Sequence, residues 1–458
     1  MAFRFSPPAP GPERLRRRSN CVSRRSRPFD PSRLQPTLID LALRDRLEQA
    51  SHPDPFSVLL ELRHGARSED LLQLAPHARP IGAPSRGLFT ARLTKSEILA
   101  LAGRGGAVLY RIWLNHPVRA LSLAAIQADA ALAGFRAAGR GIVWAVADSG
   151  IAAHAHFDRY GNLELPAGLE HRDFTGGGSP LTDEFGHGTH VAGILAGAAP
   201  EGASLPPGAD AGLRGVAPEA KLLSLKVLAA DGAGEVSNVL AAIDYIQQIN
   251  DYGRRLLVHG VNLSLGYEFD PEWFACGASP LCQEIDRLVL SGVSVVVAAG
   301  NSGYGWQNSL HTGVTPGCLD LTINDPGNAE LAITVGSTHR ERPHTYGVSY
   351  FSSKGPTGDG RMKPDLVAPG ERIVSCAAPS RAPQGTDWRT AYVEDSGTSM
   401  AAPHVSGAIA AFLSVRREFI GRPLAVKELF LSTATDLRRA PQFQGRGLVN
   451  LFRALQAA

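Results

Sequence analysis

The chain has 458 residues, of which 44% are hydrophobic and 19% charged, and its formal net charge is +3. This composition suits a soluble globular protein with a substantial buried core. No run of about 18 apolar residues is present, so the sequence predicts no membrane span. The five cysteines are too few and too irregularly spaced for a disulfide framework or a zinc site.

The most basic stretch is residues 1–33, which hold nine arginines against Glu13 and Asp30, together with several prolines. This composition is typical of a solvated, disordered arm. Residues 1–49 are interpreted in this way, with a possible short helix at 37–49. No motif indicates nucleic acid or a membrane as a partner, although such contact stays open.

The basic start leads into prolines and polar residues instead of an apolar segment, so we expect no signal peptide and a cytoplasmic location. An organelle transit peptide, or an export signal hidden by a wrongly assigned start, stays open. In the cytosol the thiols would be reduced, although Cys276 and Cys282 could form a bridge if oxidised.

Residues 50–121 have the pattern of a compact α+β module. Apolar alternation and a capping box formed by Thr94 and Glu97 define its elements. In chain order these are a strand (56–63), a helix (69–75), a strand (87–94), a second helix and a strand (107–115).

From about residue 122 to residue 458, apolar strands alternate with helices. This order is typical of an α/β fold in which helices cover both faces of a mostly parallel sheet. Functional residues of such folds gather beyond the carboxyl ends of the strands. Asp148, Ser264 and Asn301 each lie at the end of an apolar strand, so we expect them there.

The motif GHGTHVAG contains His187 and His190, three residues apart. Two histidines at this spacing could hold a metal ion. No glutamate lies between them as in HExxH, and no third ligand is evident, so a metal is disfavoured. The alternative is that His187 acts as a general base oriented by a carboxylate.

The segment SGTSMAAPHVSG, residues 396–407, places Ser399 before an apolar stretch that favours a helix. Taken singly, Ser399 suits a helix cap, and Asp148 and Asn301 suit turns. Together with His187, they supply the hydroxyl, base, carboxylate and oxyanion donor that acyl transfer needs.

These motifs resemble those of the subtilisin-like serine peptidases, the subtilases, in which Asp, His and Ser follow in the same order. The resemblance covers roughly residues 122–458 and includes DSG, GVAPEAKLLSLKVL, VNLSLG, VAAGN and FSSKGPTGDGRMKPDLVAPG. It implies a serine endopeptidase with Ser399 as nucleophile, His187 as general base and acid, and Asp148 as orienting carboxylate. Asn301 and the Ser399 N–H would stabilise the oxyanion, aided by the positive end of the helix.

The resemblance also implies that an extended peptide is added as a strand between two edge segments. The second edge and a strand end would form the walls of the pocket for the residue before the scissile bond. The substrate-binding residues predicted in this way are Gly232, Ala233, Gly234, Ser264, Leu265, Gly266, Ala298, Ala299 and Gly300. The walls carry no charge, and an unpaired buried charge is costly, so we expect apolar or aromatic residues before the cut. The pocket floor is expected near Asn324.

Residues 50–121 resemble the inhibitory, ferredoxin-like prodomain of the family. We expect this module to assist folding, to block the cleft as an intramolecular inhibitor and to be removed by the enzyme itself near residues 121–124. Leu121 or Leu123 before the cut would suit an apolar pocket.

The chain departs from the family pattern in two loops. Where many members hold a structural calcium, the loop after HVAGILAG offers only Glu201 and Asp210, so calcium is not supported there and no cofactor is expected. The insert at 301–321 is longer than in compact members and could be a lid or an exosite.

Two other functions are weighed against the peptidase. A pseudoprotease that only binds peptides would normally lack at least one of the four catalytic side chains, and none is lost here. An esterase or amidase for small substrates is disfavoured because paired edge segments suit a polypeptide.

Overall fold

The computed structural model describes residues 38–49, 55–81, 87–114, 117–120, 128–201, 203, 213–267, 276–309, 313–340 and 343–458. The chain divides into two units at Thr37/Leu38, and all described residues belong to the second, Leu38–Ala458. Residues 1–37 of the predicted arm, the predicted cleavage region at 121–124 and Asp210 lie outside the described residues. The helix expected within 37–49 is present as α1 (Leu41–Gln49).

Within the second unit, a four-stranded antiparallel sheet in the order β2-β3-β1-β4 lies early in the chain. Its strands are β1 (Phe56–Leu62), β2 (Arg79–Pro80), β3 (Leu88–Leu93) and β4 (Leu109–Leu114), and its helices are α1 (Leu41–Gln49), α2 (Ser68–Leu74) and α3 (Lys95–Arg104). The predicted capping box is confirmed, because Thr94 N donates to the Glu97 carboxylate at 2.7 Å and the Thr94 hydroxyl accepts from Glu97 N.

Both faces of β1 are buried. Val58 and Leu60 share an apolar core with the helices α1, α2 and α3, whereas Leu59 between them packs in a cluster with α6 (Val236–Ile249) and α7 (Pro280–Leu290). An antiparallel sheet can leave one face to water. Here the larger fold covers that face.

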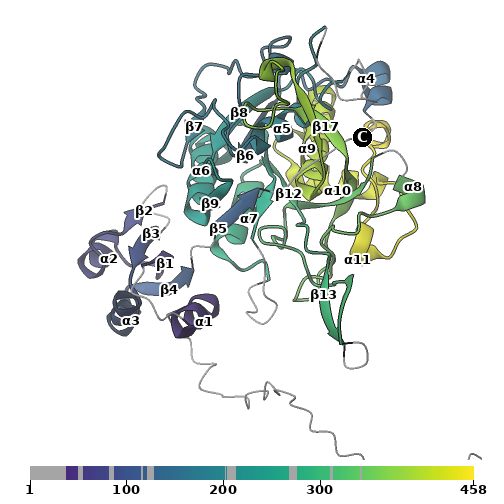
Figure 1. Cartoon of the computed structure of the whole chain (residues 1–458). Coiled ribbons are helices and arrows are strands. Elements are labelled where there is room, and N and C mark those ends of the chain that lie inside the picture. The colour runs from purple at the N-terminus through teal and green to yellow at the C-terminus, as the bar shows by residue number, and fades with distance from the viewer. Residues whose placement is uncertain are drawn as a thin grey trace, which may run out of the picture. The chain divides into compact units, whose positions relative to one another are not determined.

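The larger fold is built on a seven-stranded sheet in the order β16-β15-β12-β10-β6-β8-β7. Figure 1 labels its strands β6, β7, β8 and β12. Its strands are β6 (Val143–Asp148), β7 (Arg172–Asp173), β8 (Lys221–Lys226), β10 (Gly260–Leu263), β12 (Ser294–Ala298), β15 (Ile333–His339) and β16 (Leu366–Glu371). All neighbouring pairs are parallel, which confirms the predicted α/β fold.

Alternation along β6 shows how the sheet is covered, because successive side chains point to opposite faces. Trp144 and Val146 pack with α5 (His187–Leu195) and α9 (Thr398–Val415), whereas Ala145 packs with α6 and α7. Helix α9 is long and apolar enough to cross a membrane by length and composition, but 89% of it is buried. That burial fits a helix of the protein core.

The remaining elements form small sheets and peripheral helices. The strands are β5 (Pro117–Ala120), β9 (Ala233–Glu235) and β11 (Leu265–Gly266) in one sheet, β13 (Tyr304–Ser309) with β14 (Gly313–Cys318), and β17 (Ile373–Cys376) with β18 (Tyr392–Asp395). The helices are α4 (Asp129–Phe135), α8 (Pro343–Tyr346), α10 (Pro423–Thr433), α11 (Pro441–Gln444) and α12 (Leu451–Ala457).

Two local expectations are refined by the structure. The segment around VNLSLG was expected to be one strand but forms two, since β10 and β11 belong to different sheets with Ser264 between them. Cys276 and Cys282 are both free thiols.

Candidate active site

Asp148 is the last residue of β6, a central strand whose six residues are all buried. A buried carboxylate is costly unless it is hydrogen-bonded. Its Oδ1 accepts from Ser149 N at 2.8 Å and from His187 Nδ1 at 2.7 Å. These bonds hold the carboxylate at the edge of the sheet, against the imidazole.

His187 is the first residue of α5 and is 2% exposed. The ring reaches Asp148 because α5 approaches the turn after β6 very closely at Gly188. A Cβ atom at Gly188 would lie 2.2 Å from the Gly150 carbonyl oxygen, so only glycine fits. With the Nδ1 proton directed to the carboxylate, Nε2 is the basic nitrogen of the ring.

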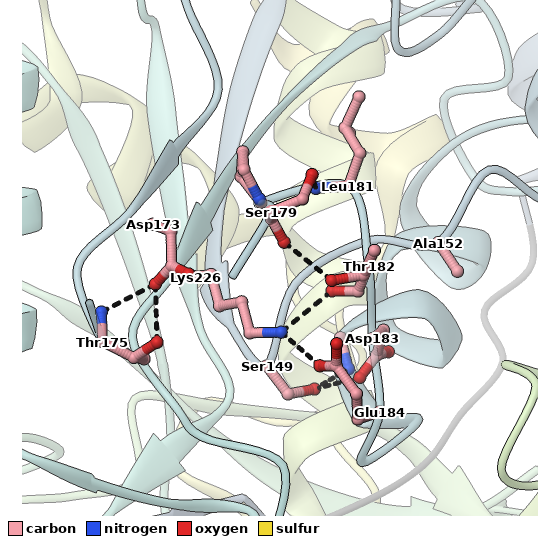
Figure 2. A network of polar contacts seen from close by, with 12 residues as sticks. Ser149, Ala152, Asp173, Thr175, Ser179, Leu181, Thr182, Asp183, Glu184 and Lys226 are labelled. Atoms are coloured by element: carbon pink, nitrogen blue, oxygen red, sulfur yellow. Dashed lines mark hydrogen bonds and ion pairs between the residues drawn. The ribbon is translucent and has the colours of Figure 1, made fainter. Parts of the chain in front are cut away.

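A second buried carboxylate, Asp183, joins the same two segments, and Figure 2 shows it beside Ser149. Asp183 Oδ1 accepts from Ser149 Oγ at 2.8 Å and from Gly186 N at 2.7 Å. Its Oδ2 accepts from the N and Oγ1 atoms of Thr189 at 2.8 and 2.7 Å. Burial raises the pKa of Asp183, and these hydrogen bonds oppose that effect. Asp183 thereby fixes the start of α5 relative to the turn after β6.

Two further side chains labelled in Figure 2, Lys226 and Asp173, make polar contacts in the neighbouring loop. Lys226, the last residue of β8, is almost fully buried, and its Nζ donates to Thr182 O at 3.2 Å and pairs with Glu184. Asp173 Oδ1 accepts from the N and Oγ1 atoms of Thr175 at 2.7 and 2.6 Å. These contacts hold the loop that precedes α5.

Ser399 is the second residue of α9, and Gly397 is the residue at the cap position. The interpretation of Ser399 as a helix cap is therefore wrong. Its side chain is fully buried, and within the described parts of the chain its Oγ has no hydrogen-bond partner, His187 included. No described group therefore engages this hydroxyl, which leaves it available for a catalytic role.

The elements that carry these groups meet at one edge of the sheet. Strands β6, β10 and β12 are neighbours, and their carboxyl ends lead to Asp148, Ser264 and Asn301. Helices α5 and α9, whose first turns carry His187 and Ser399, pack against each other. Ser264 Oγ donates to the Ser399 carbonyl and joins the two sides of this edge.

Asn301 is oriented by the residue before Ser399. Its Oδ1 accepts from Thr398 N at 2.9 Å and from Thr398 Oγ1 at 3.0 Å, and Thr398 Oγ1 accepts from Gly300 N at 3.1 Å. Because Oδ1 is held in this way, the Nδ2 amide is the group left to donate to a reacting oxygen. The sequence motifs did not single out Thr398, since a threonine in a helix start has many ordinary roles.

The predicted edge segments lie partly in strands: β9 begins at Ala233 and β11 at Leu265, so Gly232 and Ser264 each precede a strand. A third strand lies between β9 and β11. Strand β5 pairs antiparallel with β9 on one side and with β11 on the other. Val118 lies opposite Gly234, and Ala120 lies opposite Leu265. A segment of the chain itself therefore occupies the place where sequence analysis expects a peptide.

The predicted pocket walls and floor also come together. Ala298 ends β12, and Ala299 and Gly300 follow it, all buried. Asn324 N donates to Ala299 O at 2.9 Å, and a Cβ atom on Gly300 would lie 2.6 Å from Asn324 Cγ. Asn324 also lies close to Gly266, because a Cβ atom added to Gly266 would be 3.5 Å from the Cβ atom of Asn324.

A histidine paired with a carboxylate, and a serine in the first turn of a helix that packs against the histidine's helix, are the groups used by serine hydrolases that work through an acyl-enzyme. The profile of Peptidase_S8, the subtilase family, matches residues 139–449, well over half of the chain. The chain belongs to the subtilase family and is a serine endopeptidase with an Asp/His/Ser triad.

Several relatives agree with this assignment. Serine protease AprX of Bacillus subtilis (strain 168) is 32% identical over 379 residues, which cover 79% of this chain and 77% of that protein. Subtilisin DY of Bacillus licheniformis is 32% identical, covering 68% and 89% respectively. The intracellular serine protease of Paenibacillus polymyxa is 33% identical, covering 68% and 80%.

Proposed function

We propose that Ser399 is the nucleophile of this endopeptidase, that His187 is its general base and acid, and that Asp148 orients the imidazole. The observation that carries this assignment is the 2.7 Å Asp148–His187 hydrogen bond at the start of α5, together with a serine hydroxyl on the packed helix α9 that has no polar partner among the described residues. We expect the Ser399 hydroxyl to bond Nε2 once substrate binds, because catalytic hydrogen bonds often tighten only in that complex.

In the proposed reaction, His187 Nε2 takes the hydroxyl proton as Ser399 Oγ attacks the peptide carbonyl carbon. Asn301 Nδ2 and the Ser399 N–H donate to the resulting oxyanion. The protonated imidazole then passes its proton to the leaving amine, and water releases the acyl group through the reverse roles. Asp148 stays ionised throughout and stabilises the imidazolium.

Casein hydrolysis by the purified wild type and by Ser399→Ala tests this assignment. We expect the substitution to abolish hydrolysis while the melting temperature stays near that of the wild type. Full activity in Ser399→Ala would assign the nucleophile elsewhere. Tight peptide binding by the wild type without turnover would instead support the pseudoprotease.

We propose that substrates bind as an extended strand between β9 and β11, with an apolar or aromatic residue before the cut. The position of β5 supports this mode, because its backbone already pairs with both edges. The uncharged walls at Ala298–Gly300 support the apolar preference, because a charged side chain there would lose its water without gaining a partner. A panel of tetrapeptide anilides ending in Leu, Phe, Lys or Glu would measure the preference.

We propose that the four-stranded module is an intramolecular inhibitor and folding aid. Besides β5, Ser57 Oγ donates to Glu235 Oε1 at 2.8 Å, and Leu59 and Trp113 share an apolar cluster with α6 and α7. Blocking of the cleft by the chain's own strand would suppress activity until that strand is released.

We propose that the enzyme removes this module itself, by a cut within 121–124. The end of β5 supports a cut there, because Ala120, the last residue of the strand, still pairs with Leu265 of the proposed substrate-binding edge. N-terminal sequencing and intact mass of wild type and Ser399→Ala test this. A cut at the same bond in Ser399→Ala would rule out self-processing.

We propose that the enzyme acts in the cytoplasm and needs no metal or other cofactor. Two observations support the location: one relative is named an intracellular protease, and Cys276, Cys282, Cys318 and Cys376 are free thiols. Catalysis by a triad requires no metal, and in the loop where many relatives bind calcium the only carboxylates are those of Glu201 and Asp210, fewer oxygens than calcium prefers. Unchanged activity and melting temperature in EDTA, together with cell fractionation, would check both proposals.

A further inference from the structure

The β13–β14 hairpin presents an apolar face to solvent. Its register places Tyr304 opposite Cys318 and Trp306 opposite Pro316, so these side chains share a face. The exposed residues of this face, called here the ribbon face, are Tyr304, Trp306, Val314, Pro316 and Cys318. Trp306 is 73% exposed and Val314 65%. An exposed apolar patch of this kind is typical of a binding surface.

The base of the hairpin is held firmly by the body of the fold, from which Figure 1 shows it projecting. Gly303 N donates to Phe351 O at 2.9 Å, and the buried Lys354 Nζ donates to Gly303 O at 2.6 Å. A Cβ atom on Gly303 would lie 1.9 Å from Ser352 O, so this clamp requires glycine. The ribbon face is thus preformed, and a partner would not have to order it.

The base of the hairpin lies close in the chain to residues of the proposed substrate cleft. It is inserted between Asn301, the proposed oxyanion donor, and Asn324, the floor of the proposed pocket. The Tyr350 ring, 66% exposed, packs edge-on against Tyr304 at 5.7 Å and widens the apolar surface. A polypeptide that extends beyond the cleft past Asn301 would therefore approach the base of this hairpin.

We propose that the ribbon face is an exosite for protein substrates, which binds an extended apolar segment lying outside the residues that pair with β9 and β11. This inference rests on the proposed cleft function. Aromatic side chains on a rigid ribbon offer a large contact area at little entropic cost. Short substrates would not reach the exosite, so it would favour unfolded or loosely folded proteins over small peptides.

Two other occupants fit the surface less well. The sequence from 301 to 321 contains no Lys or Arg, whereas attraction to an anionic membrane relies on such residues. A stable dimer typically buries 20–30 residues on each side, far more than the ribbon face supplies.

The test compares casein with a tetrapeptide anilide as substrates for purified wild type, Trp306→Ala and a control, Tyr346→Ala. Tyr346 is an aromatic residue of α8 that is 61% exposed and does not belong to the ribbon. We expect Trp306→Ala to lower kcat/KM for casein about fivefold, mainly through KM, because exposed tryptophan anchors often carry much of a contact. The tetrapeptide rate and all rates of Tyr346→Ala should stay at wild-type levels.

Equal casein kinetics in wild type and Trp306→Ala would overturn the exosite. So would flotation of the wild type with vesicles of phosphatidylcholine and phosphatidylserine, or a dimer that Trp306→Ala dissociates, if casein kinetics are unchanged. If Trp306→Ala also slows the tetrapeptide, Val314→Ser gives the second test, with the same expected selectivity for casein. Failure of the wild type to cleave the tetrapeptide would contradict the proposed function itself.

Discussion

A buried histidine lies against each end of α5, and the two differ in their partners. At the start, His187 donates to the Asp148 carboxylate at 2.7 Å. Near the end, His156 contacts the Tyr392 hydroxyl at 3.0 Å and the Gly193 carbonyl at 3.2 Å. Both rings are almost fully buried.

The comparison shows that burial alone does not make a histidine useful in catalysis. Among neutral partners, burial lowers the pKa of His156 to about 3, and that of nearby His154 to about 4. A neighbouring carboxylate instead stabilises the imidazolium that forms when a histidine takes up a proton as general base. The protein therefore separates a structural histidine from a reactive one by the charge of the neighbouring group.

The largest effect is expected when the carboxylate next to His187 loses its charge. Asp148→Asn should lower kcat/KM about 10⁴-fold, the loss known for this change in another serine protease triad, with the fold retained. Steady-state hydrolysis of a tetrapeptide anilide measures it, and circular dichroism checks the fold. His156→Gln is the matched control, and we expect its kcat/KM to change less than about threefold. Similar losses in both variants would contradict the distinction between the two histidines.

The next effect concerns the donor oriented by Thr398. Asn301→Ala should lower kcat about 10²–10³-fold with little change in KM, which is the loss established for subtilisin itself. A rise in KM at constant kcat would mean that Asn301 binds the ground state instead.

The buried histidines His154 and His156, which are neutral in the fold, should make the stability of the protein sensitive to acid. In the unfolded chain His154 and His156 titrate near pH 6.5, whereas in the fold their pKa values are about 4 and 3. The unfolded state thus binds more protons as the pH falls below 6.5, and stability falls with it. Between pH 7 and pH 4 these shifts predict a loss of about 3 kcal/mol for each of the two histidines.

Urea unfolding of Ser399→Ala, in which self-digestion is absent, measures this dependence. Adding His154→Gln and His156→Gln should flatten the slope. An unchanged slope in that variant would assign the acid sensitivity to other groups, such as the carboxylates.

The smallest effect is expected from the second buried carboxylate. Asp183→Asn keeps the size of the side chain but replaces one carboxylate oxygen with an amide group that cannot accept hydrogen bonds. Some of the bonds that join Ser149 to the start of α5 are then lost, so we expect kcat to fall about tenfold with KM unchanged. Asp173→Asn, which removes a carboxylate from the same loop without touching α5, should leave kcat intact. Equal losses of activity in the two variants, in proportion to lost stability, would reduce Asp183 to a structural role.

Much of the peptidase fold follows from local pattern. The apolar runs that became β6, β8, β10 and β12 predict buried parallel strands, and polar residues at their carboxyl ends predict a site at one edge. The motifs around Asp148, His187 and Ser399 indicate acyl transfer because few other reactions need that set. Nothing local could distinguish Ser399 from a helix cap, and the structure excludes the cap by placing Gly397 there.

The sequence by itself determined the order of elements, the family and the types of group available, because these depend on periodicity and on short motifs. Tertiary structure decided which polar groups meet, such as Asp183 with Ser149 and Thr398 with Asn301. It also decided which strands pair, since β5 lies between β9 and β11. Such contacts join residues far apart in the chain. They form only when packed helices and strands fix them at hydrogen-bonding distance, which no local pattern encodes.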